Sequence, residues 1–355
     1  LSGGRVALPT RAAGNVISWY LEFIDNRNLE LGTRDFNGSP RFSTGYVPIR
    51  NRPGILIETH MIKDYKYRVV GTYDFLRAAL EEVNADPHRL LAVGENADRL
   101  TVQDCGTGKP YPLAFELTDD VTPFELKAFS YETEHSEISN DERVVFGREP
   151  LDLTVPMYDT FRITETVIPP FAYIVPRQWQ DVIEVIKVHG IQTQTLESLK
   201  RISVESYRFR NVQWPEGPFE GRHMPRFDVE PVVEEREFPA GSLIVPLAQP
   251  LARVVMNLLE PKAPDSFVRW AFFNAIFEEK EYGEHYVLET LARQMLAENP
   301  SLDDEFQDRL TNDPEFAASP AERLRFFYKR SPYWDPQMNL YPVGRITSPH
   351  DWQDW

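Results

Sequence analysis

The stretch that decides the fold runs from residue 42 to residue 68 and reads FSTGYVPIRNRPGILIETHMIKDYKYR. Within it, Pro53 and Gly54 precede a short apolar run over residues 55–59, which is typical of a buried strand. From Asp64 onward, apolar residues recur at helical spacing. A buried strand followed by a helix predicts an α/β fold for this part of the chain.

Glu58 is predicted to lie at the end of this strand, where the chain leaves the sheet. In open α/β sheets, ligands bind outside the carboxyl ends of the strands. A carboxylate held there among Ile and Leu side chains would be partly desolvated, which raises its pKa toward values useful for proton transfer. Glu58 is therefore the candidate catalytic residue. The alternative is structural, because a glutamate at a strand end is often simply paired with Lys or Arg.

Four further residues of this stretch are candidates for substrate binding. Strand alternation places His60 on the same face as Glu58. Arg50 and Arg52 can each hold a terminal carboxylate through a two-pronged guanidinium contact, or can brace Glu58 or face solvent instead. Tyr46 supplies a phenol close to Glu58 in the sequence.

Outward from this stretch, the chain divides into three predicted parts. Residues 1–104 are predicted to be α/β, with helices over 13–28, 64–84 and 86–100. Residues 105–245 are predicted to be β-rich, with alternating patterns at 124–129 and 151–155 and one α/β unit, a strand, helix and strand over 172–192. Residues 246–355 are predicted to be helical, since prolines separate periodic segments. These segments are 247–259, 266–277, 282–298, 302–310 and 321–328.

The bulk composition excludes several classes of function. The 38 basic and 55 acidic residues give a net charge of −17, which repels phosphate backbones, so nucleic acid is not an expected partner. The sequence contains no apolar run of about 18 residues, so no membrane span is expected. The single cysteine, Cys105, cannot form an internal disulfide or a cysteine-based zinc site.

The run from Gly45–Tyr46 through Arg50–Arg52 to Ile55–Glu58, followed by residues 63–68, resembles the closing strand of the M14 family of zinc carboxypeptidases. In that family the last catalytic carboxylate lies at the end of this strand, and Glu58 matches its position. The resemblance implies that Glu58 acts as general base and then general acid toward a zinc-bound water. The family also covers its substrate with a tyrosine upstream of the glutamate. Tyr46 is the nearest match, at a shorter spacing, so the resemblance leaves two roles open: Tyr46 covers the substrate, or it forms a wall of the pocket.

The C-terminal part carries a second resemblance. Residues 238–345 include Pro239–Ser242, Gln249–Arg253, Leu258–Pro261 and an aromatic segment at 270–277, and they are similar to the C-terminal extension of a group of bacterial M14 proteins. This similarity marks the family and implies nothing about mechanism. It also favours a periplasmic or secreted location, as is common for such bacterial proteins. The sequence does not indicate an oligomeric state.

The zinc ligands of the family are not present in this chain. M14 enzymes bind zinc through a His-x-x-Glu motif and a later histidine, all preceding the catalytic glutamate, yet no histidine occurs between Leu1 and Glu58. A zinc site of this type needs three protein ligands. The chain, which begins with Leu rather than Met, is therefore identified as the C-terminal portion of such an enzyme. We expect zinc in the complete protein, and neither bound zinc nor activity for this portion alone.

Two classes of function follow from the sequence. The leading hypothesis is a zinc-dependent metallocarboxypeptidase that hydrolyses the C-terminal bonds of peptide substrates, with Glu58 as general base. The alternative is a non-catalytic peptide- or cell-wall-binding module derived from a peptidase fold. A serine or cysteine hydrolase is disfavoured, because no Gly-x-Ser-x-Gly motif occurs.

Overall fold

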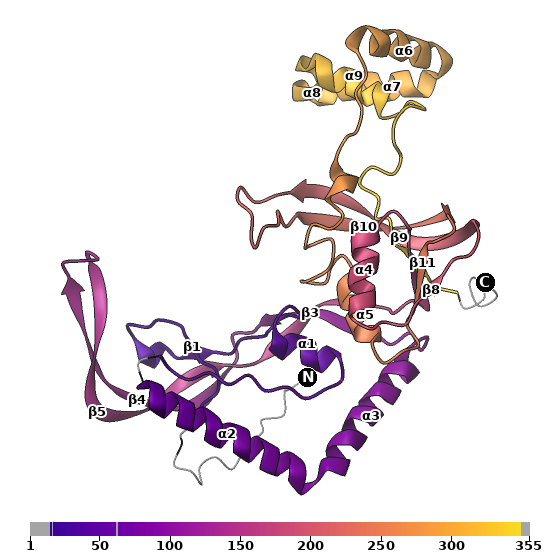
Figure 1. The fold of residues 1–355 in the computed structure, drawn as a ribbon. Coiled ribbons are helices and arrows are strands. Elements are labelled where there is room, and N and C mark those ends of the chain that lie inside the picture. Colours follow the sequence, from indigo (N-terminus) through magenta and orange to yellow (C-terminus); the bar gives the residue numbers. More distant parts are fainter. Residues whose placement is uncertain (1–14, 16, 62, 349–355) are drawn as a thin grey trace.

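The computed structural model describes residue 15, residues 17–61 and residues 63–348. Three parts follow one another along the chain (Figure 1). An N-terminal part with a long hairpin and two long helices leads to a central sheet, and a group of short helices lies beyond it. In the described ranges, no helix is both long and apolar enough to cross a bilayer.

The centre is a six-stranded sheet with strand order β10-β9-β12-β7-β11-β8. Strand β7 (Ala172–Val175) is buried at all four positions, because a strand covered on both faces requires an apolar residue at every position. It pairs antiparallel with β11 and with β12. The other members are β8 (Gln194–Thr195), β9 (Lys200–Gln213), β10 (Arg226–Phe238), β11 (Leu243–Pro246) and β12 (Gly344–Ile346).

Alternate residues of β7 face two separate cores. Tyr173 and Val175 belong to the larger core, which also contains buried residues of α4 (Gln180–Val188) and α5 (Ala252–Leu259). Ile174 belongs to a smaller core. The helix predicted between 172 and 192 is confirmed as α4, and β7 and β8 flank it.

A buried charge network fixes β12 to the centre. The carboxylate of Glu260, 2% exposed, accepts hydrogen bonds from the hydroxyls of Tyr173 at 2.5 Å and Tyr207 at 2.8 Å. Arg345 belongs to β12, and its Nε lies 3.1 Å from Oε1 of Glu260. Its Nη1 lies 2.7 Å from Oε2 of Glu205. Strand β12 (residues 344–346) thus lies in the same sheet as β7, and helix α5 packs on the same core. The structure therefore does not separate the two parts at the predicted boundary, residue 245.

The N-terminal part is built on a long antiparallel hairpin. Strand β4 (Val121–Ser136) pairs with β5 (Asp141–Tyr158), which confirms the strands predicted at 124–129 and 151–155. Because β2 pairs parallel with β5, residues on both sides of the predicted boundary at 104 share one sheet. The smaller elements here are β1 (Glu22–Phe23), η2 (Leu29–Leu31), β2 (Thr33–Arg34), β3 (Tyr111–Leu117) and β6 (Phe161–Val167), of which β3 and β6 form a separate two-stranded sheet.

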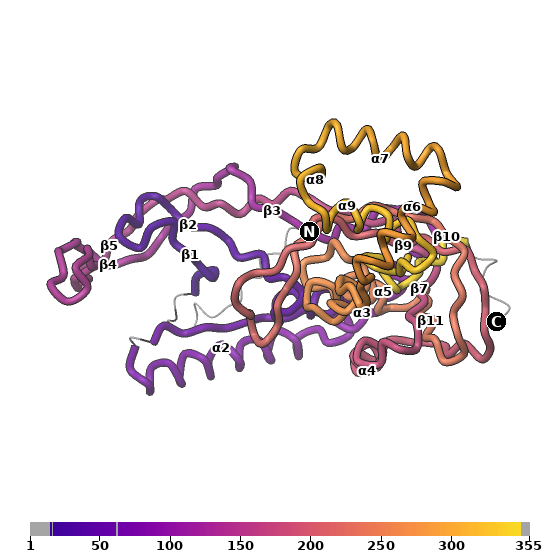
Figure 2. The backbone as a smooth tube through the Cα atoms, turned by 90° about the horizontal axis from the view of Figure 1, so that it is seen from above, coloured from indigo at the N-terminus to yellow at the C-terminus, as the bar shows by residue number. Residues whose placement is uncertain are grey.

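Two long helices, α2 (Tyr65–Ala85) and α3 (Pro87–Asp104), confirm the helices predicted over 64–84 and 86–100. The side chain of Asp86 caps α3 by accepting a hydrogen bond from the amide of Arg89 at 3.0 Å, and Pro87 occupies the first turn. Both views show α2 extending away from the central sheet on the same side as the β4–β5 hairpin (Figures 1 and 2). Phe75 is its one buried residue among those described.

Two predictions near the N-terminus are wrong. Of the residues predicted as a helix over 13–28, residue 15 and residues 17–28 are not helical, and β1 lies among them. Residues 55–59 form no strand, and Ile55 and Leu56 are 58% and 55% exposed. An isolated strand leaves its backbone donors and acceptors unpaired. In the described part of the chain, no strand pairs with this segment.

The C-terminal helices confirm three predicted segments, at 282–298, 302–310 and 321–328. They are α6 (His285–Glu298), α7 (Pro300–Asn312) and α9 (Pro320–Tyr328), with the short α8 (Pro314–Ala318) between the last two. The prolines begin α7, α8 and α9 rather than separating them, because proline is tolerated in the first turn of a helix. Four phenylalanines form their core, namely Phe306, Phe316, Phe326 and Phe327.

Two other helix predictions in this region need correction. The helix predicted over 247–259 forms only from Ala252, as α5. The helix predicted over 266–277 is wrong, because this segment consists of turns and the short 3-10 helix η3 (Asn274–Phe277). Ala271 has a φ of 62°, which a right-handed helix cannot accommodate.

Candidate functional site

The structure brings two of the predicted site residues together with one distant histidine. Tyr46 lies on α1 (Ser43–Ile49), and Arg50 follows one turn later, so both side chains project from the same face. The Arg50 guanidinium donates a hydrogen bond through Nη1 to the Tyr46 hydroxyl at 3.1 Å. That hydroxyl lies 2.6 Å from Nδ1 of His189, the residue that ends α4. We refer to Tyr46, Arg50 and His189 as the α1–α4 cluster.

The electrostatics of the α1–α4 cluster favour a neutral imidazole. Burial lowers the pKa of His189 below its ordinary value of 6.5, and the Arg50 charge lowers it further. A neutral Nδ1 accepts the Tyr46 hydroxyl hydrogen, while the Tyr46 oxygen accepts from Arg50. This assignment of donor and acceptor requires the imidazole proton to be on Nε2. Among the described residues, no carboxylate forms an ion pair with Arg50, so its other N–H groups remain available for an anionic ligand.

Arg52 has a different role from Arg50. Its guanidinium makes a two-pronged ion pair with Asp98 of α3, with hydrogen bonds of 3.0 and 2.8 Å. The Arg52 hydrogen bond is the largest cause that lowers the pKa of Asp98. The neighbouring Asn51 is buried with a φ of 59° and donates to Asp98 and Thr101. Arg52 therefore braces the turn after α1 against α3.

Glu58 and His60 follow Arg50 of the α1–α4 cluster in the chain. Both side chains are exposed on the irregular segment that follows Pro53 and Gly54. No hydrogen bond or ion pair between described residues joins Glu58 to Tyr46 or Arg50. The burial that the sequence predicted for this carboxylate is not found, because the strand that was to bury it does not form. The catalytic role of Glu58 stays a prediction based on the family resemblance.

The described residues do not fit a catalytic zinc. Within these ranges, no group of three His, Cys, Asp or Glu side chains is placed to hold a metal ion. Cys105, at the end of α3, donates its S–H to the carbonyl oxygen of Leu247 at 2.6 Å. Burial, followed by the charge of Asp104, raises the pKa of this thiol to about 11, so it is protonated at neutral pH.

His189 is the residue that the sequence analysis missed. It lies 143 positions from Tyr46, and its contact with Tyr46 depends on α4 packing beside the N-terminal segment. In the sequence, His189 precedes Gly190, and glycine is common just after the end of a helix. That signal indicates a helix end and says nothing about a partner.

Comparisons with known proteins give a partial similarity to carboxypeptidases. The chain is 29% identical over 98 residues to proteins named Carboxypeptidase 2 from the fungi Trichophyton tonsurans and Trichophyton equinum. Each match covers 28% of this chain and 18% of the fungal protein, so it spans about a fifth of those relatives. No family model matches the chain, and no solved structure matches it.

Proposed function

We propose that this chain contributes the substrate-binding part of a carboxypeptidase-like hydrolase, in which Arg50 binds the terminal carboxylate of a peptide. The observation that carries the proposal is the α1–α4 cluster, where Tyr46 and His189 orient a guanidinium that has no acidic partner among the described residues. The similarity to fungal proteins named carboxypeptidase supports the same class. Arginine suits this task because its planar fork matches the geometry of a carboxylate.

The proposed chemistry assigns the proton transfers to Glu58, on the family resemblance. Its carboxylate takes a proton from water as the water oxygen bonds to the carbonyl carbon of the terminal peptide bond. The same proton then passes to the amine nitrogen as the C–N bond breaks, which releases the C-terminal residue. An exposed segment that carries Glu58 is compatible with approach to a bound peptide. No step is assigned to zinc, since the described residues do not fit it.

Substitutions in the natural full-length protein test this proposal. Release of the C-terminal residue is measured on a peptide with a free terminus and on the same peptide with an amidated terminus. Arg50→Gln should raise KM for the free peptide roughly tenfold or more, because it removes a charge-assisted hydrogen bond. Glu58→Gln should lower kcat about a hundredfold or more with KM little changed. Glu82→Gln, on the exposed surface of α2, serves as the matched control.

The same measurements distinguish the alternative of a peptide-binding module. That module would bind the free peptide more tightly than the amide and lose affinity on Arg50→Gln, yet release no residue. Equal turnover by Glu58→Gln and Glu82→Gln would refute the role of Glu58. Equal affinity of the Arg50→Gln variant and the unmodified protein for the free peptide would refute the role of the cluster.

A further inference from the structure

The antiparallel pair of strands β9 and β10 contains a shift of register between Arg226 and Asp228. Arg226 pairs with Gln213, whereas Asp228 pairs with Arg210, so two residues of β9 oppose Phe227 alone. This is a β-bulge, and Asn211 adopts a left-handed φ of 50° in it. Bulges re-aim side chains and are over-represented beside functional sites.

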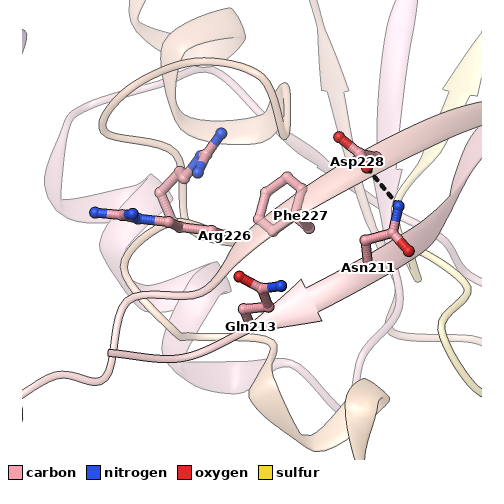
Figure 3. A pocket seen from close by; sticks show the side chains of 6 residues that line it. Asn211, Gln213, Arg226, Phe227 and Asp228 are labelled. Atoms are coloured by element: carbon pink, nitrogen blue, oxygen red, sulfur yellow. Dashed lines mark hydrogen bonds between the residues drawn. The ribbon is translucent and has the colours of Figure 1, made fainter. Parts of the chain in front are cut away.

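Two adjoining hollows open at this bulge, with volumes of about 430 and 720 Å³. Both hollows are open to solvent. Both hollows are lined by Arg226, Phe227, Asp228 and Arg269, and Figure 3 shows the Phe227 ring between the Arg226 and Asp228 side chains. The larger hollow also has apolar walls, formed by Ala114, Pro215, Met224, Pro225, Val229 and Pro264.

The two arginines line this space together with the carboxylates of Asp228 and Glu165. Within the described part of the chain, neither Arg226 nor Arg269 forms an ion pair. Arg269 is half-buried, with its guanidinium 4.4 Å from the Phe227 ring centroid. Burial lowers the pKa of Arg269, the charge of Arg226 lowers it further, and the charge of Glu165 partly offsets both effects. An anion bound between the two guanidinium groups would relieve this repulsion.

The remaining charges define what kind of anion fits. Asp228 accepts a hydrogen bond from Asn211 at 2.7 Å, and Glu165 pairs with Lys262 at 2.9 Å. The larger hollow therefore contains three cations and two carboxylates, which leaves one positive charge in a protein of net charge −17. A single negative charge is complementary to this balance, and the apolar walls suit a hydrophobic substituent.

We propose that this hollow binds one carboxylate attached to an apolar group, with Arg226 and Arg269 holding the carboxylate. The apolar group would lie against Met224 and Val229. The ligand is either a small organic acid or the C-terminal residue of a peptide, since both present the same chemistry. This site does not depend on the proposed hydrolysis, because its residues differ from the α1–α4 cluster and from Glu58.

Calorimetric titration of the full-length protein with N-acetyl-phenylalanine and with its neutral amide tests the proposal. The acid should bind, and the amide should bind at least tenfold more weakly, because it lacks the charged hydrogen-bond acceptor. Arg226→Gln should weaken binding of the acid by a similar factor. Arg201→Gln, an exposed arginine on the same strand pair, is the matched control and should leave binding unchanged.

Three results would overturn the proposal: equal binding of acid and amide, equal binding by the Arg226→Gln and Arg201→Gln variants, or binding of inorganic phosphate as tight as that of the acid. A tripeptide that ends in phenylalanine separates the two sources. Tighter binding of the tripeptide indicates a peptide ligand, and binding of the single residue alone indicates a small acid. Either result supports the carboxylate site, whether or not the protein hydrolyses peptides.

Discussion

His189 lies half-buried against Tyr46, and its surroundings disfavour the charged imidazolium. Burial first and the Arg50 charge second lower its pKa from the ordinary 6.5. The unfolded chain therefore binds a proton at a higher pH than the folded chain does. Between the two pKa values, the free energy of unfolding rises with pH. We predict that the contribution of His189 to the free energy of unfolding is complete above pH 6.5. It is lost as the pH falls below 6.5 and passes through the pKa of the folded state.

Two measurements check this prediction. The imidazole resonances of His189 should titrate below pH 6.5 in the folded protein and near 6.5 in urea. The stability of His189→Gln should fall less between neutral and acidic pH than that of the unmodified protein. A folded pKa of His189 at or above its value in urea would contradict the argument.

At the level of residues, the sequence identified local partners and missed distant ones. Tyr46 and Arg50 were both candidates, and their contact follows from a spacing of four on one short helix. Arg52 was a candidate for substrate binding or for bracing Glu58, and the structure pairs it instead with Asp98, which lies 46 positions away. His189 could not be paired with Tyr46, because their contact depends on how α1 and α4 pack. Glu58 was placed by a strand that does not form.

Among the elements, β12 depends on a buried charge network for its place in the sheet. Arg345→Met would leave the Glu260 carboxylate, whose side chain is 2% exposed, without its cation. Breaking a buried ion pair in this way costs about 3–5 kcal/mol. We expect that loss in the free energy of unfolding measured by urea titration. Arg162→Met removes a pair with Glu116 whose side chains are 67% and 56% exposed, so it should lower the free energy of unfolding far less.

A second substitution separates loss of the charge pair from loss of packing. Adding Glu260→Gln to Arg345→Met removes the unpaired charge and should recover part of the lost stability. The opposite result, in which Arg345→Met costs no more than Arg162→Met, would mean that Glu260 is stabilised by its tyrosine partners alone. Tyr173 and Tyr207 would then be sufficient donors for the buried carboxylate.

The sequence predicted the long helices α2 and α3, whose hydrogen bonds are local, but it did not predict which strands pair. Helices α2 and α3 follow directly from their apolar periodicity and from Pro87. A strand needs a partner that the sequence does not specify, so residues 55–59 looked like a strand and are not. Strand β12 was missed for the same reason, since its three residues acquire their role only between β7 and β9. Periodicity also did not reveal that Leu80 of α2 is 70% exposed.

On the scale of the whole molecule, the C-terminal helices form a separate group inserted between two segments of the chain that belong to the centre. The chain leaves the centre after η3 and forms α6–α9 around a phenylalanine core of its own. It then returns, and the Tyr341 amide donates to the Tyr207 carbonyl at 2.8 Å before β12 joins the sheet. Figure 1 shows two extended connections between these helices and the centre. The segment 278–284 is one of them and is irregular.

The path of the chain through the C-terminal helices and back to the sheet predicts the effect of one proteolytic cleavage. A site-specific protease sequence inserted after Lys280, in the irregular segment 278–284, should be cleaved in the folded protein, since that backbone lacks helix or strand hydrogen bonds. The two pieces should still elute together in gel filtration, because β12 pairs with β7 and β9 and Arg345 binds the buried Glu260. They should separate in denaturant.

In the cut protein, Arg345→Met should promote release of the C-terminal piece, whereas Arg162→Met should not. Separate elution of the cut, unmodified protein under native conditions would show that β12 is held too weakly to be part of the central sheet.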